Sequence, residues 1–342
     1  MQTITITTDS KVSKILIGES LANLSKYLPQ GKTIIITDSN IYKLYGDKFP
    51  PIPVISIGLG EKNKTIHTLT YIFDKLVENE ADRTTYIVAI GGGIVCDVAG
   101  FAASIYMRGL RYGFVSTTLL SQVDASVGGK NGVNFRGFKN MIGVFNQPDF
   151  VMVDIEMLQT LSDKEYRSGF AEIVKAAAIK NESLFQYIEE HYRQALNKDP
   201  EVMEHLIYES VLIKAHVVEE DEKEQGERKK LNFGHTFAHS IEHNTGMLHG
   251  EAVSIGMALA AELSVKLGLL SQNEQDRLVQ LLRNLELPVE RYIEYNSMVA
   301  AMKKDKKRQG DDLHMVFLDR IGHALIKKVS INQLENKNYD LR

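Results

Sequence analysis

The chain has 342 residues, of which 44% are apolar and 25% charged, and this composition predicts a soluble globular protein with room for two domains. Its 40 basic and 44 acidic residues give a formal charge of −4, which excludes nucleic-acid binding through a general positive field. The single cysteine, Cys96, excludes an internal disulfide framework and favours a reducing cytoplasm. No basic or apolar leader opens the chain, and its most apolar stretch, 252–261, is about half as long as a membrane span. We therefore expect neither a signal peptide nor a membrane partner.

The first half of the chain predicts an α/β fold. A β-branched run over 33–37 ends in Asp38-Ser39-Asn40, which is typical of a turn followed by a helix cap. Apolar residues recur with helical spacing over 64–80. Further strands are predicted at residues 86–90, 113–116 and 150–154. Because strands alternate with helical segments, we expect a parallel sheet with helices on its faces.

After Asp154 the pattern becomes helical. Ser162 and Ser271 each open a capping box that a glutamate completes three residues later. Helical periodicity extends over residues 167–180, 201–220, 236–242 and 250–267. We therefore predict an N-terminal domain with a parallel sheet over 1–154 and a mostly α-helical C-terminal domain over 155–342.

A glycine triplet, Gly91-Gly92-Gly93, joins the strand at 86–90 to the next helix. Backbone amides can approach a phosphate at such a turn, because glycine has no side chain and a helix N-terminus favours an anion. The triplet lacks the spacing of the Gly-x-Gly-x-x-Gly fingerprint, so a tight packing turn is the alternative. Asp97, residues 60–64 and Thr117-Thr118 add polar groups near the carboxyl ends of strands, where ligands of parallel sheets collect. Together these features favour a dinucleotide site.

A glycine-rich loop with lysines is predicted over 124–140. Gly128-Gly129-Lys130 resembles half of a phosphate loop, although the spacing is wrong for a Walker A motif. With Lys139 and Asn140, Lys130 offers two positive charges and an amide donor, which suit a phosphate dianion. A surface loop with solvated lysines is the alternative, but Asp124 beside the lysines favours a shaped site.

A set of histidines and a carboxylate indicates a metal site. His235 and His239 are four residues apart and share a helical face, and His249 follows. Glu172 and Lys175 lie at i and i+3 in an otherwise apolar helical segment. The zincin glutamate is absent between the first two histidines. Core or surface histidines and a buried salt bridge are the alternatives, but the combination favours a catalytic metal with open positions that polarises a substrate hydroxyl or carbonyl.

The ordered motifs resemble those of the 3-dehydroquinate synthases, a family of the sugar-phosphate cyclase superfamily. The resemblance covers nearly the whole chain. The residues that carry it are Asp38 to Asn40, Gly60-Glu61 with Lys64, Gly91 to Asp97, Arg108-Gly109, Asp124 to Lys130, Lys139-Asn140, Gly169 to Lys175, Lys214, Asp221 to Glu224, Arg228, Asn232 to His239, His249 to Glu251 and Asp305 to Lys307.

The resemblance implies a role for individual positions. The ligands of a divalent metal, zinc or cobalt, would be Glu172, His235 and His249. The NAD site would contain Asp38, Asn40, Glu61, Lys64, Gly92, Gly93, Asp97, Thr117 and Thr118, and Lys139 would serve NAD or substrate. The substrate phosphate and its neighbouring groups would contact Lys130, Asn140, Arg228, Asn232 and His239. The substrate carboxylate would contact Lys214 and Arg228, with Lys306 or Lys307 nearby, and Arg108 would reach across the interface of a homodimer.

The reaction implied by the resemblance converts a sugar phosphate, 3-deoxy-arabino-heptulosonate 7-phosphate, to 3-dehydroquinate and phosphate. It proceeds by transient oxidation with NAD, β-elimination of phosphate, re-reduction and an intramolecular aldol, in which the enzyme chiefly holds the conformation. His239 would transfer a proton. Lys175 would orient the site electrostatically, and Asp124 would position the oxidised hydroxyl or the nicotinamide end.

Some positions depart from the family pattern. Ala238 and Ala177 stand where glycine is frequent, and Asn131 stands where threonine or alanine is frequent. The loop over 242–249 is shorter than in many members, so Glu251 or His243 could replace His249 as a ligand.

Three other functions compete with this interpretation. A valiolone- or deoxy-inosose-type sister cyclase shares most motifs. A glycerol dehydrogenase-like enzyme shares the two-domain fold but needs neither Lys130 nor Arg228. A non-catalytic nucleotide- or metal-binding protein could lose Asp124, His239 or Lys175, yet all three are present.

Overall fold

The structure, a computed structural model, describes residues 1–9, 11–290 and 312–330. Contacts divide the chain into two compact units: a sheet unit of Met1–Leu161 with Met203–Lys223, and a helical unit of Ser162–Val202 with Glu224–Arg342. Residues 203–223 therefore pack with the sheet unit, although they lie beyond Asp154 in the sequence. The assignment of separate functions to 1–154 and 155–342 stays a prediction.

A seven-stranded sheet organises the sheet unit, in the order β1-β2-β9-β6-β5-β3-β4. Only the β1–β2 pair is antiparallel among these neighbours. The expected parallel sheet is confirmed, and each predicted strand matches an observed one to within a residue at its ends. The strands are β1 (Gln2–Thr7), β2 (Val12–Ile17), β3 (Thr33–Asp38), β4 (Val54–Ile57), β5 (Tyr86–Gly91), β6 (Tyr112–Ser116) and β9 (Phe150–Val153).

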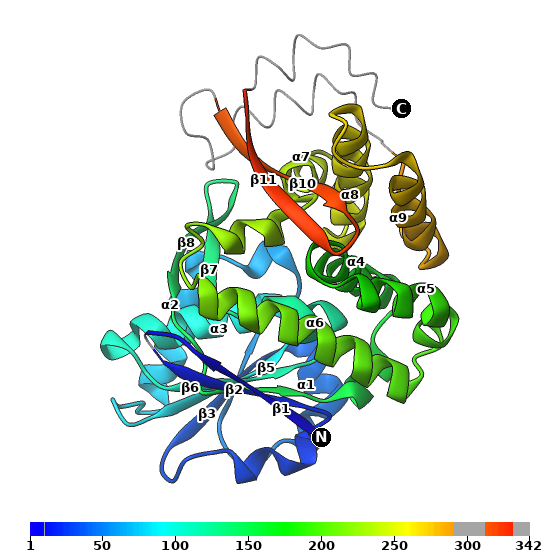
Figure 1. Ribbon diagram of the computed structural model, residues 1–342. Helices are drawn as coiled ribbons and strands as arrows, with labels where there is room; N and C mark the ends of the chain where they lie inside the picture. Colours follow the sequence, from blue (N-terminus) through cyan, green and yellow to red (C-terminus); the bar gives the residue numbers. More distant parts are fainter. Residues whose placement is uncertain (10, 291–311, 331–342) are drawn as a thin grey trace. The chain divides into compact units, whose positions relative to one another are not determined.

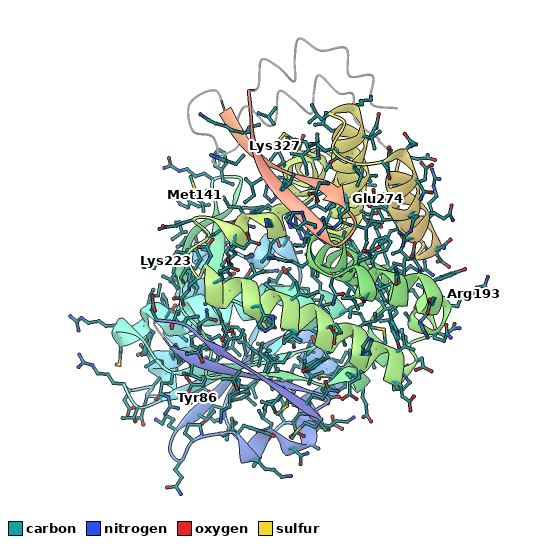
Figure 2. The ribbon with its side chains drawn as sticks, in the orientation of Figure 1. Tyr86, Met141, Arg193, Lys223, Glu274 and Lys327 are labelled. Atoms are coloured by element: carbon teal, nitrogen blue, oxygen red, sulfur yellow. The ribbon has the colours of Figure 1, made fainter. Side chains whose placement is uncertain are left out.

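Three helices pack on this sheet: α1 (Ser39–Tyr45), α2 (Ile66–Glu78) and α3 (Gly93–Ile105). The central strands β5 and β6 are buried at every residue, as expected for parallel strands with both faces covered. Tyr86, labelled in Figure 2, belongs to a core with Leu16, Ile35, Val115 and Met152 from neighbouring strands. Helix α6 (Pro200–Glu220) contributes residues 203–220 to the same unit. The sheet thus directs the β5–α3 turn and the end of β6 to one edge.

The predicted glycine-rich loop is a β-hairpin, which corrects the sequence-based expectation. Strands β7 (Lys130–Phe135) and β8 (Phe138–Phe145) pair antiparallel, with Gly132 opposite Gly143. A Cβ at Gly132 would meet the Ile142 carbonyl oxygen at 2.6 Å, and one at Gly143 would meet the Asn131 carbonyl oxygen at 2.3 Å. These glycines therefore serve close strand approach rather than loop flexibility.

The helical unit contains five helices and a hairpin within the described residues. They are α4 (Asp163–Lys180), α5 (Glu182–Leu196), α7 (His235–Thr245), α8 (His249–Lys266), α9 (Gln272–Asn284), β10 (Asp312–Arg320) and β11 (His323–Ser330). Helices α4, α7 and α9 all contact α8 (Figure 1). Glu274 on α9, labelled in Figure 2, accepts a hydrogen bond at 3.0 Å from the Ile321 N–H in the β10–β11 turn.

Helix starts agree with the capping signals. The hydroxyl of Ser162 accepts from the Glu165 N–H at the start of α4, and that of Ser271 accepts from the Glu274 N–H at the start of α9. Asp38 caps α1 through its Oδ1, which accepts from the Asn40 and Ile41 N–H groups at 2.9 Å. Across residues 1–9, 11–290 and 312–330, no helix combines the length and apolar character that a bilayer crossing requires.

Candidate functional site: a metal-ligating cluster and a nucleotide edge

Three side chains that could ligate a metal, here called the metal-ligating group, converge in the helical unit. Glu172 lies on α4, His235 is the first residue of α7, and His249 is the first residue of α8. Their ligand atoms all lie within 4.8 Å of one another. The Nε2 atoms of His249 and His235 are 3.1 Å and 3.6 Å from Oε1 of Glu172. One carboxylate oxygen and two imidazole nitrogens could hold a zinc- or cobalt-like ion and leave coordination positions open.

Close helix packing brings His249 to Glu172. The Gly250 N–H donates to the Ser168 hydroxyl at 3.0 Å. A Cβ at Gly250 would lie 1.8 Å from the Ser168 carbonyl oxygen, so only glycine allows this approach of α8 to α4. Ser168 precedes Glu172 by about one helical turn, so the contact places the start of α8 beside the carboxylate.

The carboxylate of the cluster is held ionised. Lys175, one turn after Glu172 on α4, forms an ion pair with it, and both residues are only 2% exposed. Burial alone raises the pKa of Glu172, but Lys175 and His249 outweigh it and lower the pKa to about 2. A deprotonated carboxylate is the form that a metal requires.

The structure separates His249 from its alternative, Glu251. The Oε2 of Glu251 accepts from the Leu248 N–H at 3.0 Å, and Lys164 lies 3.5 Å from the same oxygen. Glu251 therefore caps α8 and is outside the metal-ligating group. The side chain of the other alternative, His243, lies outside the described residues.

His239 lies beside the cluster but is not part of it. Its ring centroid is 5.8 Å from that of His235, and the two rings meet edge-on at 87°. His239 is one helical turn after His235, so both project from one face of α7. A partly buried imidazole next to a metal-ligating group is suited to proton transfer.

Two further predicted residues flank α7 in the helical unit. Arg228 and Asn232 lie in a short 3₁₀ helix, Glu227–Asn232. Arg228 is 1% exposed, and Asn232 donates through Nδ2 to Glu224. Lys180 and Lys230 both pair with Glu227 at the start of this segment. Ion pairs thus tie the start of this segment, and the Arg228 side chain is buried within it.

In the sheet unit, the β5–α3 turn has the features of an anion site. Gly92 caps α3 without any side-chain hydrogen bond, so the first N–H groups of the helix keep their capacity for a ligand. A Cβ at Gly92 would meet Thr118 Cγ2 at 2.9 Å, and one at Gly93 would meet Ala125 Cβ at 2.8 Å. The packing alternative is therefore supported, since the glycines let the turn lie against the segment after β6, and the phosphate site stays a prediction.

A buried ion pair stands next to this turn. Lys64 donates to the Asp97 carboxylate, and their side chains are 7% and 17% exposed. Burial raises the pKa of Asp97 above its usual value, although Lys64 opposes the shift. Thr117 is 3% exposed, and its Oγ1 has no hydrogen-bond partner within the described part of the chain. Such an atom could be satisfied by a ligand.

The other predicted nucleotide residues lie after β3, β4 and β6 or on the hairpin. Asp38 caps α1, and Asn40 is exposed. Glu61 accepts from Asn134 Nδ2 on β7 at 2.7 Å. Lys139 is exposed on β8. Thr118 bonds Ser121 and so caps the short segment after β6. The printed contacts of Asp38, Glu61 and Thr118 are thus structural ones, and the cofactor role of these residues stays a prediction.

Asp124 and Lys214 come together in the sheet unit. Lys214, buried on α6, donates to Oδ1 of Asp124 at 2.5 Å and to its carbonyl oxygen at 2.7 Å. Residues 90 positions apart in sequence are thereby joined. No spacing rule predicts this pair, because it depends on how α6 packs.

The remaining residues predicted to contact substrate are exposed or lie outside the described residues. Lys130 and Asn140 lie on the β7–β8 hairpin, and Asn140 has a left-handed φ of 49°. Arg108 is exposed and also left-handed, with φ 72°. Lys306 and Lys307 lie outside the described residues.

Comparison with known proteins identifies the family. Models described as 3-dehydroquinate synthase N-terminal and 3-dehydroquinate synthase C-terminal match residues 54–168 and 169–308. The 3-dehydroquinate synthase of Dictyoglomus thermophilum is 42% identical over 311 residues, covering 90% of this chain and 86% of that relative. The chain belongs to the 3-dehydroquinate synthase family.

Two solved structures similar to this family member are a valiolone synthase and a deoxy-inosose synthase. A 2-epi-5-epi-valiolone synthase from Streptomyces hygroscopicus subsp. jinggangensis, with NAD+ and Zn2+ bound, is 29% identical with a TM-score of 0.88, covering 98% of this chain and 97% of its own. A 2-deoxy-scyllo-inosose synthase complexed with carbaglucose-6-phosphate, NAD+ and Co2+ is 27% identical with a TM-score of 0.87, covering 98% of each chain. The expected two-domain α/β fold is thus confirmed.

Two residues that contact candidate site residues of this 3-dehydroquinate synthase family chain were not predicted from the sequence. Glu242 lies 2.5 Å from Nδ1 of His249, and Glu224 accepts from Asn232. Glu224 stood inside a family motif without a role. Glu242 had no local signal, because its partner belongs to the next helix.

Proposed function

We propose that the chain is a 3-dehydroquinate synthase, a phosphate-eliminating carbon–oxygen lyase that uses NAD and a divalent metal. Its substrate would be 3-deoxy-arabino-heptulosonate 7-phosphate, and its products 3-dehydroquinate and phosphate in the shikimate pathway. The observation that carries the proposal is the convergence of Glu172, His235 and His249, in a chain of this family. We infer a homodimer in the cytoplasm from the family resemblance and from the single buried cysteine.

The donor set of the helical unit would hold the metal. A metal bound there lowers the pKa of a substrate hydroxyl. Glu172 supplies an ionised oxygen because Lys175 balances its charge inside the protein. The Zn2+ and Co2+ of the two similar structures fit the same oxygen–nitrogen ligand set.

The edge of the sheet unit would hold NAD. NAD bound there accepts a hydride and later returns it. The α3 N-terminus and the bare turn receive a phosphate, and the unpartnered Thr117 hydroxyl adds a polar contact. The proposed cofactor contacts are Asp38, Asn40, Glu61, Lys64, Gly92, Gly93, Asp97, Thr117, Thr118 and Lys139.

Basic and amide groups of each unit would bind the substrate. In the helical unit, buried Arg228 supplies a fixed positive charge, and Asn232 supplies an amide held by Glu224. In the sheet unit, Asp124 fixes the ammonium of Lys214. The proposed substrate contacts are Arg108, Lys130, Asn140, Lys214, Arg228, Asn232 and one of Lys306 and Lys307.

Three residues would assist the chemistry. His239 would move a proton, because its imidazole lies one helical turn from His235 and its ring nitrogens can donate or accept a hydrogen bond. Lys175 would hold positive charge beside the Glu172 carboxylate. Asp124 would orient the reacting hydroxyl or the nicotinamide end.

A substrate panel tests the proposed function. The protein is loaded with Zn2+ or Co2+ and catalytic NAD, and phosphate release is measured with 3-deoxy-arabino-heptulosonate 7-phosphate, a sedoheptulose phosphate and a hexose phosphate. We expect release only from the first, with no net NADH in the absorbance at equilibrium. Release from another sugar would assign a sister cyclase, and NADH accumulation with glycerol would assign a polyol dehydrogenase. Either result rejects the proposal.

A further inference from the structure

Glu242 contacts the Nδ1 edge of the His249 ring, whereas the Nε2 edge faces Glu172 of the metal-ligating group. Glu242 lies near the end of α7, and its side chain is 2% exposed. Its Oε1 is 2.5 Å from Nδ1 of His249, while Nε2 of the same ring is 3.1 Å from Glu172 Oε1. The imidazole is therefore held from both sides by carboxylates with different positions in the fold.

We propose that Glu242 is a positioning residue that fixes the tautomer and the ring orientation of His249 for metal binding. The inference rests on the proposed function, because it requires that the cluster binds a metal. Neutral imidazole carries one proton, and the nitrogen that lacks it is the ligand. A carboxylate that accepts the Nδ1–H leaves the lone pair on Nε2, which is the nitrogen directed at Glu172.

The helix register makes this arrangement possible. Glu242 follows His235 by seven residues on α7, so both lie on about the same helical face. Helix α7 thus supplies one candidate ligand directly and orients another that belongs to α8. The two helices approach closely at Gly256 of α8, where an added Cβ would lie 2.1 Å from the Gly234 carbonyl oxygen at the start of α7.

Backbone and side chain of His249 are then fixed separately. The Gly250–Ser168 contact fixes the start of α8 against α4. It leaves the imidazole free to turn about its χ2 bond, which is a broad torsion. The hydrogen bond from Nδ1 to Glu242 removes this freedom. Glu242 itself is outside the metal-ligating group and has no role of its own in the proposed reaction.

Metal affinity measures the role without reference to turnover. Zn2+ is titrated against a chromophoric chelator into wild-type protein, Glu242→Gln and Glu242→Ala. We expect Glu242→Ala to weaken the affinity about 10- to 100-fold, as is typical when the outer partner of a ligating histidine is lost. Glu242→Gln should lose clearly less Zn2+ affinity, because its amide oxygen can still accept a hydrogen bond from the Nδ1–H of His249.

A matched control exists in the same unit. Asp319 lies 2.7 Å from Nδ1 of His323 and so forms a histidine–carboxylate pair of the same kind on the β10–β11 hairpin. Asp319→Ala should leave the Zn2+ affinity unchanged. Circular dichroism of each metal-free variant checks that its fold is retained, and the isosteric Glu242→Gln keeps the test possible should Glu242→Ala unfold.

A second readout reports on His249 itself. In the Co2+-loaded protein, the exchangeable N–H of a ligating imidazole gives a shifted proton resonance. We expect the His249 resonance to be sharp in the wild type and to broaden by exchange with water in Glu242→Ala. The same loss in Asp319→Ala would contradict the assignment.

The outcomes separate this inference from the proposed function. If the Zn2+ affinity of Glu242→Ala stays within about twofold of the wild-type value, the positioning role is overturned, because loss of such an outer partner typically weakens metal affinity far more. Equal losses in Glu242→Gln and Glu242→Ala also overturn it, because the charge rather than the acceptor would then matter. In both cases wild-type phosphate release leaves the proposed function standing. A wild-type protein that binds no divalent metal rejects both.

Discussion

The candidate nucleotide edge of the sheet unit and the metal-ligating cluster of the helical unit are built in different ways. At the edge, the backbone forms the site: Gly92 and Gly93 leave room at the α3 N-terminus, and the nearby charges of Lys64 and Asp97 pair with each other. In the cluster, side chains from three helices form the site, and buried charges hold them. A site made of side chains should fail when one of them is lost, whereas a site made of backbone should fail mainly when a side chain is added.

The largest expected effect is the loss of a ligand in the cluster. His249→Ala should lower phosphate release about a thousandfold or more, because a metal contributes several kcal/mol to such a step. NAD binding, measured by calorimetry, should remain near the wild-type value, because the proposed NAD contacts lie in the other unit. Wild-type phosphate release by this variant in the presence of a chelator would show that the ligand assignment is wrong.

Adding a methyl group to a glycine in each region sharpens the comparison. Gly250→Ala would place its Cβ 1.8 Å from a backbone oxygen, so we expect it to lower the free energy of unfolding by about 3 kcal/mol or more. Gly92→Ala would meet the tip of the Thr118 side chain at 2.9 Å, so its cost should be about 1 kcal/mol, with a clear loss of NAD affinity. Urea unfolding and NAD titration measure the two effects. Equal destabilisation by both variants would contradict the comparison.

The cluster should also depend on pH through His249. Burial lowers the pKa of His249, but hydrogen bonds to Glu172 and Glu242 raise it from 6.5 to about 9 in the metal-free protein. A metal must displace this proton, so the apparent Zn2+ affinity should rise about tenfold per pH unit from about pH 7 to 9 and then level off. Chelator competition at several pH values measures the slope. A flat profile would mean that His249 is already neutral at pH 7.

The same shift sets the pH dependence of metal-free stability. Because the folded pKa of His249 exceeds the ordinary value of 6.5, its stabilising contribution is complete below about pH 6.5 and is lost as the pH rises through about 9. Glu172 acts in the opposite direction, and its contribution is lost only as the pH falls from about 4.5 through about 2. Urea unfolding of the metal-free protein should therefore show a decline between pH 6.5 and 9. Glu242→Gln should show a smaller decline.

The smallest effect on ligand binding is expected at Asn131, where the sequence departs from the family pattern. Its buried amide donates to the Tyr112 hydroxyl and to the Gly129 and Asn146 carbonyl oxygens. Asn131→Ala should lower the free energy of unfolding by about 1–2 kcal/mol, because buried acceptors lose their donor. Zn2+ affinity should not change. A change in metal affinity would contradict the separation of the two regions.

Local sequence patterns predicted much of the fold, because the forces that decide strands and helix starts are local. β-branched runs produced the buried strands β3 and β5. Asp38, Ser162 and Ser271 each cap the helix that begins at the next residue. The glycine-rich stretch after Asp124 misled the prediction. Within it, Gly132 permits close pairing of two strands, and pairing depends on a partner that the local pattern does not reveal.

By itself, the sequence determined most of the sheet strands and helix starts, the family resemblance and the residue types that a metal and a phosphate require. The tertiary structure decided which of these residues meet. It brought Glu172, His235 and His249 within 4.8 Å, set Glu251 aside as a helix cap, paired Lys214 with Asp124 and placed Glu242 behind His249. These contacts join residues on different helices. They follow from helix packing, such as the approach that Gly250 allows, and packing is a property of the whole unit rather than of any one segment.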